Sequence, residues 1–139
     1  MDTATIKARK SVRIFTDQPI APETIAELER FIASDANPFG VPVTFRILDR
    51  EKYGLSSPVI LGAETYIGAK CKRQEHAELA FGYSFEKLVL FATTLGLGTA
   101  CLAGTLAAPL QMATLRDSAV TVTVKSELWI FFVFALLRF

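Results

Sequence analysis

The chain has 139 residues, and its 15 basic and 14 acidic side chains give a formal net charge of +1 at pH 7. This length predicts one domain over residues 1–139, able to bury roughly two-thirds of its unfolded surface. A nearly neutral chain lacks the overall field that attracts nucleic acid or an anionic membrane, so any cationic binding site must be local. Two cysteines and one histidine are too few for a four-ligand structural zinc site.

The first residues, MDTATIKARKSVR, lack the apolar run of a signal peptide, so we expect a reducing, cytoplasmic location and inert thiols. Residues 3–10 predict a short helix with Ile6 as its apolar anchor. A basic cluster follows, made of Arg9, Lys10, Ser11 and Arg13. Such a cluster is either solvated charge or a phosphate clamp, because guanidinium groups fork onto phosphate oxygens and a serine hydroxyl adds a donor. Composition alone leaves both interpretations open.

The next elements alternate between helix and strand. Residues 22–34 predict an amphipathic helix, with Pro22 in its first turn and apolar residues at helical spacing. Residues 34–42 hold two prolines and a glycine and predict a loop. Residues 43–49 alternate apolar and polar side chains, which predicts a half-buried strand. A polar connection at 51–58 and a second strand within 63–70 complete this half.

The long stretch from Ala77 to Leu95 predicts the central helix. Its apolar residues fall on every face, so we expect burial on all sides, and the polar run 71–78 is expected to open the helix. Glu86 interrupts the apolar pattern, and a buried carboxylate needs a partner from elsewhere in the fold. The helix is expected to stop at Gly96, since glycine takes the left-handed conformation after a helix.

The residues after Gly98 are small and predict a loop whose backbone approaches a flat ligand, although a glycine pair after a helix also serves simply as a cap. Further on, residues 119–124 predict a strand. The apolar run 128–137 predicts either a central strand or a mispaired edge strand, and it needs cover because an exposed apolar strand would aggregate. Ten apolar residues are about half of what a helix needs to span a bilayer, so we do not expect a transmembrane anchor here. The order of elements predicts an α+β fold, with helices packed on a mixed or antiparallel sheet.

Two stretches together resemble the nitroreductase family of FMN-dependent oxidoreductases: the basic cluster at 9–13, and GYSFEKLVLFATTLGLGTACLAGTL at 82–106. The phrases NPFG at 37–40, ETYIGAK at 64–70 and the stretch 95–105 resemble its TM-nitroreductase branch. The resemblance covers residues 5–106. Residues 107–139 form a divergent C-terminal part, altered or truncated relative to the family pattern.

The resemblance implies a mixed sheet wrapped by helices, with FMN at the interface of a homodimer. It also implies that NADH or NADPH reduces the flavin, which passes electrons to a small-molecule acceptor such as a nitroaromatic, a quinone or another flavin. By position, Arg9, Lys10, Ser11 and Arg13 would hold the FMN phosphate and ribityl chain. The backbone of Leu102, Ala103 and Gly104 would lie against the isoalloxazine ring. No catalytic side chain and no metal are implied.

The resulting hypothesis is a cytoplasmic flavoprotein, an FMN-binding oxidoreductase that uses NAD(P)H. Its alternative is a non-catalytic nitroreductase-like remnant that acts as a dimerisation or interaction module. A weaker third interpretation is peripheral membrane association through the apolar residues 129–137.

Overall fold

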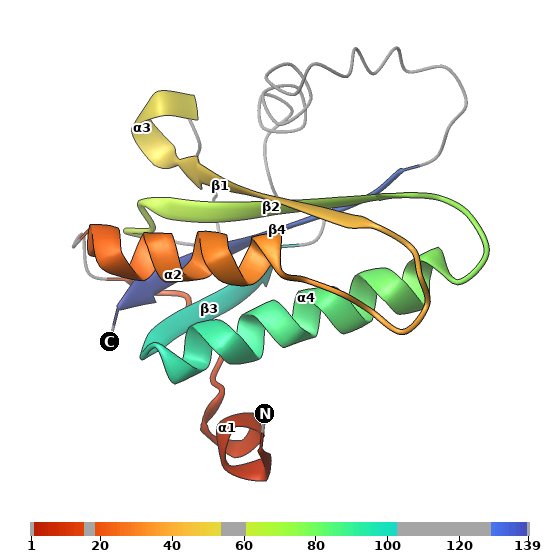
Figure 1. Ribbon diagram of the computed structural model, residues 1–139. Helices are drawn as coiled ribbons and strands as arrows, with labels where there is room; N and C mark the ends of the chain where they lie inside the picture. Colours follow the sequence, from red (N-terminus) through yellow and green to blue (C-terminus); the bar gives the residue numbers. More distant parts are fainter. Residues whose placement is uncertain (1, 16–18, 54–60, 103–128, 139) are drawn as a thin grey trace.

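The computed structural model describes residues 2–15, 19–53, 61–102 and 129–138. Its strands form one sheet in the order β1-β2-β4-β3, and each neighbouring pair is antiparallel. The strands are β1 (Val43–Asp49), β2 (Thr65–Lys72), β3 (Leu97–Leu102) and β4 (Trp129–Arg138). The helices are α1 (Thr3–Ala8), α2 (Pro22–Ala33), α3 (Arg50–Tyr53) and α4 (Ala77–Thr94). The prediction of an α+β fold is therefore confirmed (Figure 1).

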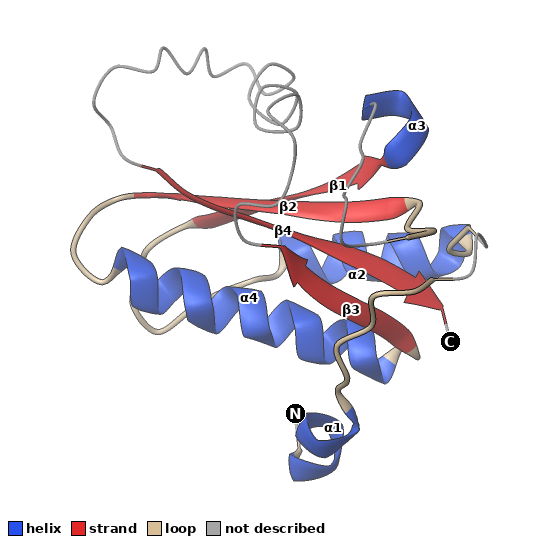
Figure 2. Ribbon diagram, turned by 180° about the vertical axis from the view of Figure 1, so that it is seen from behind, coloured by secondary structure: helices blue, strands red, loops and turns tan. Residues whose placement is uncertain are grey.

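The two longer helices, α2 and α4, lie on the same face of the sheet (Figures 1 and 2). Helix α4 contacts all four strands as well as α2. The core between helices and sheet is apolar, and its buried members include Leu28, Phe45, Ile67, Phe81, Phe85, Leu88 and Val89. Because the helices cover one face, the described part of the chain is a two-layer structure.

The predictions for the first half of the chain are mostly confirmed. Helix α2 begins with Pro22 at its first turn and ends at Ala33, one residue earlier than predicted. Strand β1 has the predicted bounds. Strand β2 is shifted by two residues, and the short helix α3 replaces the start of the predicted polar connection.

The polar run 71–78 does not open α4 as predicted. Cys71 and Lys72 belong to β2, where Cys71 pairs with Val43 on one side and Ile130 on the other. The helix begins only at Ala77, after His76 with φ +61°. The strand continues because its backbone has partners on both sides, which outweighs the polar composition of the run.

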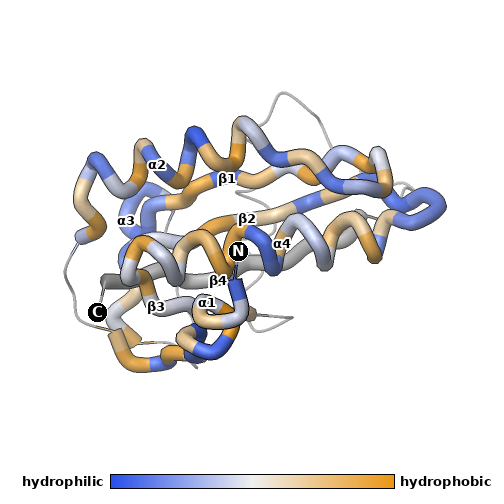
Figure 3. Tube along the Cα trace, turned by 60° about the horizontal axis from the view of Figure 1, so that its bottom comes forward, coloured by the Kyte–Doolittle hydropathy of each residue, from blue (hydrophilic) through white to orange (hydrophobic). Residues whose placement is uncertain are grey.

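The prediction that α4 is buried on all sides is wrong. The N-terminal half of the helix has an exposed stripe, in which Leu79 and Tyr83 keep 56% and 48% of their surface accessible. Glu86 continues this stripe and is exposed, so it is not the buried carboxylate that the sequence predicted. Hydrophilic and hydrophobic residues alternate along the trace of α4 in Figure 3. Helix α4 therefore has apolar residues on every face, but only some of these faces are buried in the core.

The end of α4 follows the prediction, but the segment after it does not. Gly96 has φ +72°, the left-handed conformation that ends a helix and that glycine adopts without strain. The predicted loop of small residues is instead strand β3, which pairs with β4 from Leu97↔Arg138 to Leu102↔Val133. Pairing with a long apolar strand overrides the low strand propensity of glycine and alanine.

The apolar run near the end of the chain is the inner strand β4, as predicted. Its backbone pairs with β2 along one edge and with β3 along the other. The strand predicted at 119–124 lies outside the described residues. No described helix is long and apolar enough to cross a lipid bilayer.

Two α4 side chains anchor the loop that joins α2 to β1. Lys87 Nζ lies 3.1 Å from Asp35 Oδ1 and donates to the Ala36 carbonyl, while the Asp35 side chain is only 6% exposed. Asn37 donates through Nδ2 to the Val41 carbonyl at 2.8 Å and to Ser84 Oγ at 3.4 Å. This loop contains the NPFG phrase, which therefore has a structural role in fastening α2 to α4.

Replacing Asn37 tests this role. Asn37→Ala removes three hydrogen bonds, including the one that Phe39 N donates to Asn37 Oδ1, and leaves the fully buried Ser84 without that partner. We expect the free energy of unfolding to fall by about 1–3 kcal/mol. Urea unfolding followed by circular dichroism measures this; a change below about 0.5 kcal/mol, typical of a surface substitution, would contradict it.

Candidate functional site

The basic cluster lies in an extended segment that runs beside β3, along the edge that does not pair with β4. Ser11 forms a parallel bridge with Thr99, and Val12 N donates to the Thr99 carbonyl at 3.0 Å. The segment then reaches Leu61, whose backbone bonds Arg13 and Phe15. The backbone of the N-terminal segment is thus fixed at two points, one on β3 and one at Leu61.

The side chains of the cluster differ in exposure. Arg9 is half-buried, whereas Lys10, Ser11 and Arg13 are exposed. Phe15 is buried and anchors the end of the segment. Lys10, Ser11 and Arg13 are therefore accessible to a ligand in solution, and Arg9 is partly so.

Arg9 has an unusual set of partners. Its Nη2 donates to Cys101 Sγ at 3.7 Å, across 92 residues of sequence. Its Nε is buried and has no hydrogen-bond partner among the residues that the structure describes. Thr99 Oγ1 is also buried without a partner, although Thr99 is only 1% exposed. Two orphaned polar atoms on neighbouring segments mark this point as under-satisfied.

The cluster also lacks a close acidic partner among the described residues. Across the described parts of the chain, no carboxylate lies within 4.0 Å of Arg9, Lys10 or Arg13. A guanidinium has five N–H donors and is always charged, and an unsatisfied charged donor is expensive to bury. Arg9 therefore suits an anionic ligand that forms charge-assisted hydrogen bonds. A flavin phosphate has this chemistry, so the residues present fit FMN.

The two cysteines are both free, with Cys71 buried and Cys101 exposed. Although Cys101 is exposed as a residue, partial burial of its thiol raises the pKa of that group, while the Arg9 guanidinium opposes this shift and Glu86 adds to it. The thiol is therefore protonated and neutral near pH 7. Cys101 accepts a hydrogen bond from Arg9 without cancelling its charge.

The structure brings together part of the predicted site. Arg9 and Ser11 lie against β3, and Leu102 is the last residue of that strand. Ala103 and Gly104 lie outside the described residues. Thr99 and Cys101 were not singled out as members of the cationic site, because nothing in the sequence shows that β3 runs beside residues 9–13.

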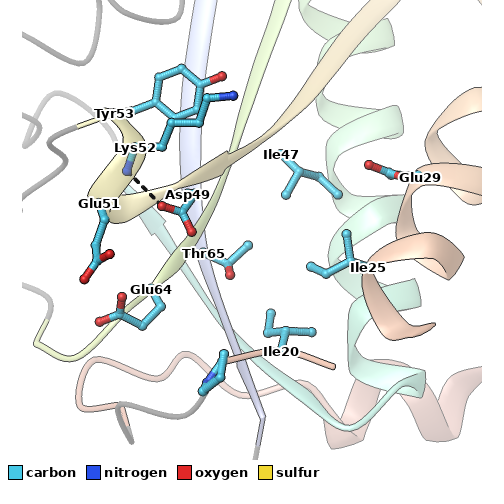
Figure 4. Close-up of a pocket in the computed structure, with 11 residues that line it drawn as sticks. Ile20, Ile25, Glu29, Ile47, Asp49, Glu51, Lys52, Tyr53, Glu64 and Thr65 are labelled. Carbon is cyan, nitrogen blue, oxygen red and sulfur yellow. Dashed lines mark hydrogen bonds between the residues drawn. The ribbon is translucent and has the colours of Figure 1, made fainter. Parts of the chain in front are cut away.

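A hollow elsewhere in the described structure has an acidic lining. A cavity of about 680 Å³ opens between α2, the end of β1 and α3. Figure 4 shows Asp49, Glu51 and Glu64 around it, with Ile25 and Ile47 on the helix side. Its carboxylates would repel a phosphate, and none of the predicted site residues lines it. The β3 edge, not this cavity, is the candidate anion site.

The described fold is a two-layer α+β domain, and its candidate anion site is a group of cationic side chains beside β3. The family model described as "Putative TM nitroreductase" matches residues 3–124, most of the chain. The chain therefore belongs to this nitroreductase family. The match extends past residue 106, where the resemblance read from the sequence ended.

Solved structures agree with this fold at low sequence identity. A nitroreductase family protein from Clostridium difficile 630 has a TM-score of 0.71 and 11% identity, over 99% of this chain and 84% of that one. A "putative nitroreductase in complex with FMN" from Desulfovibrio desulfuricans has a TM-score of 0.67 and 18% identity, over 97% of this chain and 84% of that one. An FMN-dependent nitroreductase from Clostridium difficile R20291 has a TM-score of 0.71 and 15% identity, over 96% of this chain and 85% of that one. No protein with curated annotation matches the chain in sequence.

Proposed function

We propose that the protein is an FMN-binding oxidoreductase that uses NADH or NADPH to reduce nitroaromatic, quinone or flavin acceptors. The observation that carries this proposal is Arg9: within the described parts of the chain its buried Nε lacks a partner, and its Nη2 donates to the Cys101 sulfur. Family membership supports it, as do the two structural relatives described with FMN.

The chain's own residues would bind and orient the cofactor. Arg9, Lys10, Ser11 and Arg13 would hold the phosphate and ribityl chain through charge-assisted hydrogen bonds. Leu102, Ala103 and Gly104 would offer backbone to the ring face. When bound, the flavin supplies the redox chemistry, so no acid or base from the chain is required.

The first test compares FMN with riboflavin, which lacks the phosphate. We expect the wild-type protein to prefer FMN, and Arg9→Ala to weaken FMN binding by about 1.5–3 kcal/mol, the range for a hydrogen bond to a charged group. Riboflavin binding should change little. Quenching of flavin fluorescence measures both affinities.

The matched control is Arg30→Ala, which removes a cation from α2, where Arg30 Nε bonds its own helix at Ala26. This control should bind FMN like the wild type. Equal wild-type affinity for FMN and riboflavin would refute the phosphate assignment. A purified protein that binds neither flavin would favour the alternative, a non-catalytic interaction module.

The second test concerns the ring. If backbone near Gly104 approaches the isoalloxazine, a branched side chain there should exclude the flavin. We expect Gly104→Val to lose FMN binding while its far-UV circular dichroism stays that of the wild type. Unchanged FMN affinity in this variant would show that the ring binds elsewhere.

We further propose a homodimer whose FMN site draws on both chains, as the family resemblance implies. Exposed apolar side chains support it, because Leu79 and Tyr83 form a stripe on α4 and Ile6 is 59% exposed on α1. Helices α1 and α4 are in contact, so these side chains belong to neighbouring elements. A self-complementary interface would remove this apolar surface from water.

Sedimentation tests the dimer and its link to the cofactor. At micromolar concentration we expect a dimer that FMN stabilises by mass action. Tyr83→Glu should shift the protein towards monomer, because it replaces an exposed aromatic side chain of this stripe by a charge. A stable monomer that binds FMN at full stoichiometry would exclude a shared site.

A further inference from the structure

The contact between Arg9 and Cys101 is the starting observation. A thiol is a weak hydrogen-bond acceptor, so the 3.7 Å contact gives the guanidinium little stabilisation. The buried Nε bonds nothing, so a movement of Arg9 towards a ligand would break only that one weak bond. The Arg9 side chain therefore lies beside Cys101 through one weak contact, and little free energy is lost when it turns towards a ligand.

The neutrality of the partner matters as much as its weakness. A carboxylate at position 101 would form an ion pair with Arg9 and cancel the charge that a phosphate needs. Among the described residues, the carboxylate whose charge acts on Cys101 is Glu86, which is exposed on α4 and does not pair with Arg9. The guanidinium therefore keeps its full charge beside β3.

We propose that Cys101 is a positioning residue of the anion site: its thiol lies against the Arg9 guanidinium at the edge of β3 without compensating its charge, and so favours flavins that carry a phosphate. This inference rests on the proposed function and names a residue that determines its specificity. Thr99, two positions earlier on β3, supports it, because its orphaned hydroxyl shows that this part of the edge is not closed by internal hydrogen bonds.

The first experiment compares a charged and an uncharged side chain of the same shape at position 101. Cys101→Asp and Cys101→Asn have nearly the same size, but only the aspartate can neutralise Arg9. We expect Cys101→Asp to reduce the ratio of FMN to riboflavin affinity at least tenfold, with riboflavin binding unchanged. Cys101→Asn and Cys101→Ser should keep the wild-type ratio within about twofold. A wild-type ratio in Cys101→Asp would overturn the inference.

The second experiment needs no flavin and no substitution at Cys101. Iodoacetamide alkylates thiolates, and Cys101 is exposed while Cys71 is buried, so peptide mass spectrometry reports the rate at Cys101. Inorganic phosphate, at constant ionic strength, should draw Arg9 from the sulfur and raise the pKa of the thiol. We expect the alkylation rate to fall at least twofold and saturably in the wild type, and to be independent of phosphate in Arg9→Met.

The two experiments separate the inference from the proposed function. A wild type without preference for FMN over riboflavin would refute the flavin assignment, yet the phosphate effect on Cys101 would still decide whether the thiol positions Arg9 for an anion. A phosphate effect that is missing in the wild type, or equal in Arg9→Met, would overturn the positioning role. Thermal unfolding of each variant confirms that the comparison is between folded proteins.

Discussion

The pairing of β4 on both of its edges is the constraint on which the rest of the structure depends. Strands β2 and β3 do not touch as a ladder; each bonds β4, which comes from the far end of the chain. Buried backbone groups must be hydrogen-bonded, and β4 is the strand that forms a continuous ladder with β3. The segment that carries Arg9 pairs in turn with β3 at Thr99. The candidate anion site therefore rests on a strand more than a hundred residues away in sequence.

The polar side chains at the candidate site have fewer hydrogen-bond partners than Lys87 and Asn37, which lie elsewhere in the described structure. Lys87 has a carboxylate and a carbonyl within 3.1 Å, and Asn37 uses both ends of its amide. Arg9, in contrast, has a buried donor without a partner and a sulfur as its acceptor. Folded proteins break their local rules mainly at functional sites, where the missing interaction is completed by a ligand. This contrast within one chain is the physical argument for binding at the β3 edge.

The elements that were predicted correctly have strong local signals. Helix α2 has a proline at its start and a clear apolar stripe, and Gly96 ends α4 because it accepts a positive φ. The errors occur where tertiary pairing overrides composition. Small residues after Gly98 have weak strand propensity, yet β4 draws them into the sheet. Glu86 and Leu79 are exposed because α4 meets the sheet with only part of its surface.

By itself, the sequence determined the local character of this protein: an α+β pattern of helices and strands, a near-neutral charge and a cationic cluster at 9–13 in a family-like context. Only the tertiary structure decided what that cluster faces. Cys101 and Thr99 lie some ninety residues from Arg9 and Ser11, and they meet because β3 pairs with the N-terminal segment in one register. Periodicity and propensity describe neighbours along the chain, whereas the register between distant strands depends on the hydrogen bonds of the whole sheet.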